Sequence, residues 1–306
     1  MKSKGLSRSL THKNDKWWAM FFLVPALILV IVFMVYPIAR NVQISVSDYS
    51  IKNNTTTFIG LENYTELFTE RNARFFKAYR NNILYAVVTT PLILFFGIVV
   101  AYMINKVRRG GVVFRTIYYL PVITSWVIVG LVFRYIFYSN DKGLMNYLLM
   151  NVLHVTDEPI SWLTKEWPGN IAIWTMGVWK NIGYAMIIYL AALQGVPNEL
   201  YESADIEGAS EAQKLAFITL PLVKPTTLFL LVQFLIGSFN VFLQVLMLTG
   251  GDPRGATSTL QYLLYERTFN LFEFGQGAAI GVITAVSVFV ITIVMNKAFK
   301  RERYIY

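Results

Sequence analysis

The sequence contains no cysteine, only two histidines and few acidic residues. Without cysteine, the 306-residue chain has neither a disulfide framework nor thiolate ligands for a metal. His12 and His154 lie far apart in sequence, each more typical of a solitary surface histidine than of a metal site. The GxxxxGK[ST] phosphate loop, HExxH, GxSxG and the EF-hand spacing are also missing. We therefore expect no catalytic residue, no metal site and no cofactor bound by this chain.

Charged residues are scarce as well. They make up 15% of the chain, against about a quarter in a typical soluble domain. The hydrophobic residues gather in six runs without Asp or Glu, each near or above the roughly 20 residues that cross a bilayer. These runs are residues 17–39, 81–105, 112–138, 170–193, 223–249 and 275–297. The sequence predicts an all-α integral membrane protein with six transmembrane helices, the first too long and aromatic for a signal peptide.

The net charge of +9 is distributed along the chain in a way that argues against nucleic-acid binding. Lys and Arg cluster next to the hydrophobic runs, in residues 1–16, 106–115 and 297–303. The positive-inside rule places these segments in the cytoplasm, together with the acidic connector 194–222. The predicted order is a basic tail at 1–16, a first helix at 17–39, an extracytoplasmic segment at 40–80, a membrane domain at 81–297 and a second cytoplasmic tail at 298–306.

Polar residues recur on one helical face in two of the runs. In the fifth run the offsets are 0, 4, 7 and 11, for Gln233, Gly237, Asn240 and Gln244. The fourth run has a similar face with Trp174, Gly177, Asn181 and Tyr184. Such side chains are costly in hydrocarbon unless they find partners or line a wet cavity. Two interpretations stay open: hydrogen bonds between helices, or a path for a hydroxyl-rich solute, because amides both donate and accept.

Two further features lie within the runs. Lys180 is near the middle of the fourth run, where it either faces protein or water or extends its ammonium to the surface. Gly277 and Gly281 form a GxxxG pattern, which lets helix backbones approach closely in a membrane. We expect helix packing there, within the chain or against a second subunit.

The connector between the fourth and fifth runs is unusually acidic and ordered. Pro197 suits a helix start and Gly208 suits the position after a helix end. Ser210 and Gln213 have the spacing of a capping box for a second helix. Because anionic headgroups repel a stripe of carboxylates, we expect the connector to contact a soluble cytoplasmic protein rather than the membrane surface.

The connector resembles the EAA loop of ABC importer permeases. That pattern has E-A-A, a glycine four residues later and then I-x-L-P; it is filled here by Glu202, Ala204, Gly208, Ile218, Leu220 and Pro221. Ser203 replaces the first alanine, and IEG replaces the common IDG. Further segments are similar to the sugar-permease branch related to the maltose-type subunit, namely FIGLENYTELF (58–68), FRTIYYLP (114–121), YLAALQGVPNELYESADIEGAS (189–210) and MLTGGDP (247–253).

This resemblance implies a type I ABC importer permease fold in a bacterial-type cell membrane, with both termini in the cytoplasm. It also implies partners: a second permease, two cytoplasmic ATPases that use ATP, and an extracytoplasmic solute-binding protein. The residues implied in coupling to the ATPase are Glu202, Ala204, Asp205, Gly208, Leu220 and Pro221. The solute is expected to be a sugar or an oligosaccharide.

Three alternatives remain at this point. A permease for a non-sugar solute such as a polyol phosphate fits less well, because an anion site needs more basic residues in the spans than Lys180 alone. A single-chain carrier or channel is disfavoured because the runs lack the acids that ion-coupled carriers commonly use. A membrane protein without transport activity leaves the polar faces unexplained.

Overall fold

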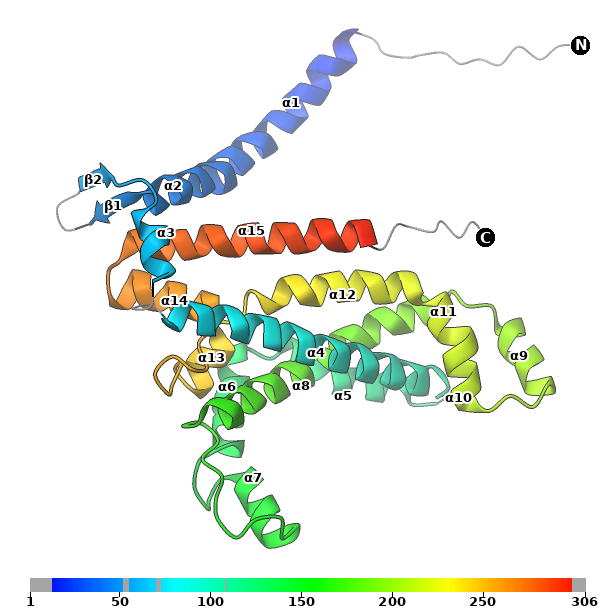
Figure 1. Ribbon diagram of the computed structural model, residues 1–306. Coiled ribbons are helices and arrows are strands. Elements are labelled where there is room, and N and C mark those ends of the chain that lie inside the picture. The colour runs from blue at the N-terminus through cyan, green and yellow to red at the C-terminus, as the bar shows by residue number, and fades with distance from the viewer. Residues whose placement is uncertain (1–12, 52–54, 70–72, 108, 299–306) are drawn as a thin grey trace, which may run out of the picture.

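The computed structural model describes residues 13–51, 55–69, 73–107 and 109–298, which are mostly helical. Much of the basic tail predicted at 1–16 and nearly all of the tail predicted at 298–306 lie outside these residues. In the described part, the strands form one antiparallel hairpin, β1 (Ser47–Ser50) with β2 (Thr55–Phe58), in which Ser47 pairs with Phe58. Figure 1 shows this hairpin at one end of a bundle of long helices.

Four helical stretches among the described residues are long and apolar enough to cross a membrane. They are Met20–Ser45, α4 (Ala73–Asn105), α8 (Glu166–Leu193) and α15 (Phe274–Ala298). Two bent helix pairs pass the same test, giving six spans if each pair is one span. These are α5 (Gly111–Ile123) with α6 (Trp126–Ile136), and Glu211–Leu222 with α12 (Lys224–Ser238).

The centre of the bundle is the contact of α8 with α4 and α5. Small residues let these backbones approach closely. This is expected in a membrane, where the surrounding lipid is as apolar as the side chains and close packing holds the helices together. A Cβ added to Gly97 of α4 would lie 2.6 Å from the Cβ of Ala185 in α8. One added to Gly183 of α8 would lie 1.9 Å from the carbonyl oxygen of Tyr118 in α5. Only glycine fits at these two crossings.

The N-terminal span stands apart from this centre. It consists of α1 (Lys13–Val30), a π-helical turn (Ile31–Val35) and α2 (Tyr36–Ser45), and the most apolar part of Met20–Ser45 has no buried residue. Figure 1 shows α1 leaning away from the other helices while α2 lies beside α15. Asn41 Nδ2 of α2 donates to the Ala278 carbonyl of α15 at 3.4 Å.

The run predicted at 112–138 is not one continuous helix. It breaks between α5 and α6, whose axes differ by 96°. Thr124 has extended backbone angles, and the Ser125 hydroxyl accepts from Val127 N at 3.3 Å, which caps the start of α6. Hydrophobic content predicted the span, but content alone does not show where a helix stops and restarts.

The run predicted at 223–249 is also interrupted. Its first helix, α12, ends at Ser238, and α13 (Leu243–Leu248) begins after a turn. Asn82 of α4 stabilises this interruption, because its Nδ2 donates to the Ser238 carbonyl at 2.7 Å and its Oδ1 accepts from Leu260 N at 2.8 Å. A buried amide from another span therefore supplies the backbone partners that a broken helix lacks.

Short elements join the long helices, most of them at the end of the bundle near the hairpin. The first are α3 (Glu62–Leu67), and α7 (Leu144–Tyr147) with the π-helical turn Leu148–Val152. The others are α14 (Leu260–Tyr265) and the π-helical turn Glu266–Asn270. Figure 1 places α3, α13 and α14 at this end and α9 of the acidic connector at the opposite end.

Candidate functional site

The connector folds as two helices around a glycine. Helix α9 (Asn198–Ile206) begins directly after Pro197. Gly208 has a φ of +75°, and the amide of Ala209 donates to the Ala204 carbonyl at 2.9 Å, which closes the end of α9. The predicted capping box at the start of α10 (Glu211–Lys214) is confirmed, since Ser210 N donates to Gln213 Oε1 at 2.7 Å while Ser210 Oγ accepts from Gln213 N.

One face of α9 is open. None of its residues is buried, and Ile206 is 89% exposed. The carboxylate of Glu202 has no hydrogen bond or ion pair within the described part of the chain. Figure 1 shows α9 projecting beyond the ends of the neighbouring helices. An exposed isoleucine beside an unpaired carboxylate provides an apolar and an anionic contact for another protein.

Asp205, near the end of α9, ties this helix to the membrane helices through a charged network. Lys214 is buried, pairs with Asp205 of α9 and donates to Glu211 Oε1 at 2.9 Å. Glu211 in turn accepts from the Tyr102 hydroxyl of α4 at 2.8 Å and pairs with Lys106, which follows α4. Asp205 therefore has an internal partner, whereas Glu202 does not.

The two lysines of this network compete for its carboxylates. Burial lowers the pKa of the Lys106 ammonium, Lys214 lowers it further, and Asp205 acts in the opposite direction. The Lys106 ammonium also lies 4.4 Å from the centre of the Tyr102 ring. The end of α4 thus responds electrostatically to where Asp205 and Lys214 lie.

The remaining connector residues attach α9 to the next span. The Tyr201 hydroxyl is 2.9 Å from the hydroxyl of Thr219, which is buried at the end of a π-helical turn (Leu215–Thr219). Leu220 and Pro221 follow in a short helix, α11 (Leu220–Leu222), and are exposed, while Ala204 is half-buried. A displacement of α9 can therefore reach both α4 and the segment that leads into α12.

The structure separates the predicted polar face of the fifth run. Gln233 and Gly237 are exposed on α12, Asn240 is exposed in the turn after it, and Gln244 is buried on α13. The prediction that all four residues share one helical face is wrong, because the helix that carries Gln233 and Gly237 ends at Ser238. Gln244 instead contacts the Tyr85 hydroxyl in the interior.

The polar positions of α8 and α12 do come together. The Tyr184 ring packs edge-on against Phe234, with ring centres 6.1 Å apart, so that Tyr184 lies next to the α12 segment that carries Gln233. Asn181 Nδ2 donates within its own helix to Gly177 O at 2.8 Å. A Cβ added to Gly237 would have open space around it. Tyr184 is therefore half-buried against α12, and Gln233 and Gly237 are exposed on that same helix.

Lys180 faces protein. It is 5% exposed, and its ammonium donates to the carbonyls of Pro121 at 2.7 Å, Val122 at 3.1 Å and Thr124 at 2.7 Å. It also lies 4.8 Å from the centre of the Trp126 ring. These carbonyls end α5, where a helix carries unpaired acceptors and partial negative charge. Lys180 binds the break between α5 and α6.

Sequence comparison supplies the family. The family described as the binding-protein-dependent transport system inner membrane component matches residues 93–304. The chain belongs to this family. It is 34% identical over 286 residues to the probable ABC transporter permease protein YurN of Bacillus subtilis, covering 91% of this chain and 94% of that protein. It is 33% identical to the arabinooligosaccharides transport system permease protein AraP of Halalkalibacterium halodurans, covering 96% and 93%.

A solved structure agrees with this assignment. The permease is similar to a chain from a bacterial alginate ABC transporter in complex with an alginate pentasaccharide-bound periplasmic protein. The TM-score is 0.78 at 26% identity, covering 94% of this chain and 96% of the other. The chain is therefore a membrane-embedded transport component with the fold of ABC importer permeases.

The two glycines predicted for helix packing lie at close contacts within this permease. A Cβ on Gly277 would lie 2.0 Å from Thr268 Oγ1, and one on Gly281 would lie 3.3 Å from Asn41 Nδ2 of α2. Sequence reasoning missed the partners of Lys180, Glu211 and Lys214. For Lys214 and Glu211 the only signal in the sequence was a single lysine among the five carboxylates of the connector. For Lys180, no neighbouring residue indicated that its partners are carbonyls at the end of α5.

Proposed function

We propose that this permease is one of two membrane subunits of an ABC importer for a sugar or an oligosaccharide delivered by an extracytoplasmic binding protein. The names of its relatives support the solute class, since AraP belongs to an arabinooligosaccharide system and the solved transporter holds an alginate pentasaccharide on its periplasmic protein. The second permease, two ATPases and the binding protein are the partners of this assembly. ATP is used by the ATPases and not by this chain.

In this proposal each bent pair counts as one span, so that the membrane domain has six. The basic residues beside the runs then place both termini and the connector 194–222 in the cytoplasm. The hairpin end of the bundle faces outward, and α9 faces the ATPase. Tyr184, Gln233, Gly237 and Asn240 line the solute path together with Asn181.

Coupling is assigned to the connector. The observation that carries it is α9 itself, which is exposed with Glu202 unpaired and is tied to α4 through Asp205, Lys214 and Glu211. When the ATPases close on ATP, they displace α9, and the network transmits the movement to the spans. Gly208, Leu220 and Pro221 shape the ends of the moving segment.

Gly208→Ala tests this assignment. Its Cβ has no neighbour within 4 Å, so the substitution introduces backbone strain without a clash. Alanine at a φ of +75° costs about 1–2 kcal/mol, which changes how α9 is presented without unfolding the chain. We expect reduced ATP-dependent sugar uptake in proteoliposomes that contain the purified complex, and unchanged amounts of assembled subunit.

Gly195→Ala is the matched control, because Gly195 precedes the same connector and its Cβ would meet only the Ala192 carbonyl oxygen at 3.4 Å. Normal coupled uptake by Gly208→Ala would remove the coupling role. Wild-type complexes that fail to import any saccharide in the presence of their binding protein would refute the solute class.

A further inference from the structure

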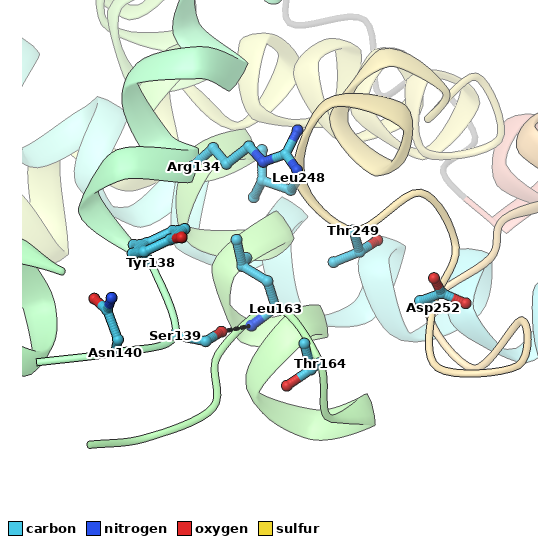
Figure 2. A pocket seen from close by; sticks show the side chains of 9 residues that line it. All are labelled: Arg134, Tyr138, Ser139, Asn140, Leu163, Thr164, Leu248, Thr249 and Asp252. Atoms are coloured by element: carbon cyan, nitrogen blue, oxygen red, sulfur yellow. Dashed lines mark hydrogen bonds between the residues drawn. The ribbon is translucent and has the colours of Figure 1, made fainter. Parts of the chain in front are cut away.

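A polar pocket lies between three segments near the hairpin end of the bundle, far from α9 (Figures 1 and 2). Its volume is about 410 Å³, within the range of roughly 300–1,000 Å³ that is usual for small-molecule sites. The end of α6 and the residues after it form one wall, the segment before α8 a second, and the end of α13 with the following turn a third. The lining residues include Arg134, Tyr138, Asn140, Thr164, Thr249 and Asp252.

The walls are held by buried hydrogen bonds. Asn146 is fully buried and donates to the Asn140 carbonyl at 2.9 Å and the Ile160 carbonyl at 3.0 Å, while its Oδ1 accepts from Trp162 Nε1 at 2.8 Å. Figure 2 shows the adjoining bond from Leu163 N to Ser139 Oγ, 2.9 Å long. The first two walls are therefore rigidly joined, as a preformed site requires.

The third wall is fixed in the same way. The hydroxyls of Thr249 and Thr257 are 2.8 Å apart, and Thr257 donates to the Asp252 carbonyl at 2.7 Å. The Tyr262 hydroxyl donates to the Gly250 carbonyl at 2.7 Å. These hydroxyls hold the turn that presents Asp252 through its backbone carbonyls. The Asp252 carboxylate takes no part in these bonds.

The charged and aromatic groups that line the pocket are exposed, and the fold makes no use of them. Within the described residues, the Arg134 guanidinium, the Tyr138 hydroxyl and the Asp252 carboxylate form no hydrogen bond or ion pair. Figure 2 shows the Arg134 side chain extending from α6 toward Leu248, with Asp252 on the wall beyond Thr249. Opposite charges that share one pocket without pairing leave donors and acceptors for a third molecule. Lys180 is the contrast, since all its donors have partners inside the protein.

We propose that this pocket is an outer subsite for one neutral saccharide unit. The inference rests on the proposed function and adds to it a site and a preference among saccharides. Arg134 donates to sugar hydroxyls, Asp252 accepts from them and the Tyr138 ring offers an apolar face to the sugar C–H groups. A cation and an anion together balance the charge, so a neutral unit gains hydrogen bonds from both, whereas for a uronate the attraction to Arg134 is offset by the repulsion from Asp252.

The test is direct binding to the assembled transporter without its binding protein. The thermal midpoint of the purified complex is measured against maltose, lactose, trehalose and digalacturonate up to tens of millimolar. We expect at least one neutral disaccharide to raise the midpoint in a saturable way. Asp252→Ala and Arg134→Gln should each weaken that response about tenfold or more, as expected for lost hydrogen bonds to a charged group.

Lys142→Ala is the matched control, because Lys142 lies on the exposed loop beside Asn140 without lining the pocket. It should leave the response unchanged. The subsite is overturned if no neutral saccharide shifts the wild-type complex, if the pocket variants respond like wild type, or if digalacturonate alone binds. It is also overturned if those variants weaken only the docking of the unliganded binding protein, which would make the pocket a protein contact.

These outcomes are separable from failure of the proposed function. If the wild-type complex imports a saccharide and the pocket variants bind and import it equally well, the proposed function stands and the subsite is refuted. If the wild-type complex shows no ATP-dependent import with its binding protein present, the proposed function is refuted, whatever the thermal midpoints show.

Discussion

Replacing Lys180 with methionine removes the ammonium that binds the break between α5 and α6 while nearly keeping the length of the side chain. An ammonium has three donors, and all three find carbonyl acceptors at the end of α5. Hydrogen bonds to a charged group contribute about 1.5–3 kcal/mol each, so the gross loss is roughly 4.5–9 kcal/mol. Methionine also relieves the cost of burying an ammonium, which is several kcal/mol. We expect a net destabilisation of about 2–4 kcal/mol.

The measurement is the thermal midpoint of the purified complex. At roughly 2–4 °C per kcal/mol for chains of 150–250 residues, the variant should unfold on the order of 5–10 °C lower than wild type. Thr175→Val is the matched control, because Thr175 is exposed on the same helix and its hydroxyl donates only to the Ile171 carbonyl, at 2.8 Å. Lys180→Arg keeps the charge and should recover part of the loss.

A second measurement asks whether the bend itself changes. The chain has no cysteine, so spin labels can be attached to introduced cysteines at the exposed positions Val113 of α5 and Leu131 of α6. In Lys180→Met the distance distribution between the labels should broaden, because the carbonyls at the break lose a fixed partner. An unchanged midpoint together with an unchanged distribution would refute the reasoning, and would mean that other groups satisfy the end of α5.

Three further predictions concern coupling, the path and the core. Lys214→Met should keep ATP hydrolysis but reduce uptake per ATP, with a stability cost under about 1 kcal/mol because the paired carboxylates are exposed; unchanged coupling would contradict the network. Asn240→Leu should impair saccharide uptake without loosening ATPase docking, and unchanged uptake kinetics would count against the path. Gly183→Ala should lower the yield of assembled complex sharply, since its Cβ would lie 1.9 Å from the Tyr118 carbonyl; a normal yield on size-exclusion chromatography would show that α5 can move away.

Local features of the connector were predictable because they depend on residues close together in the chain. The positive φ of Gly208 follows from its place after a helix, and the Ser210–Gln213 box follows from a spacing of three residues. The roles of the acidic residues were less accessible. Asp205 and Glu202 are alike in sequence, yet one pairs with Lys214 and the other has no such partner, because only Asp205 lies within reach of the Lys214 ammonium.

The interruptions between α5 and α6 and between α12 and α13 were not predictable from hydrophobicity. Each break needs polar partners for its unpaired backbone groups, and these come from other spans. Lys180 serves the carbonyls at the end of α5, and Asn82 serves those around the end of α12. The prediction that Gln244 shares one helical face with Gln233 is wrong for this reason, since α12 ends at Ser238 and Gln244 is buried on α13.

The sequence by itself determined that this chain is a helical membrane protein, because crossing hydrocarbon requires long apolar helices. It also determined the acidic, helix-forming connector, because helix caps and the glycine after a helix depend on residues close together in the chain. Only the tertiary structure decided what its few polar residues do. In a membrane a polar group must be satisfied by protein or by water, and which of these it meets depends on neighbours far away in the sequence. Lys180 is therefore internal, Glu202 is available to a partner, and Arg134 and Asp252 face a shared pocket unpaired.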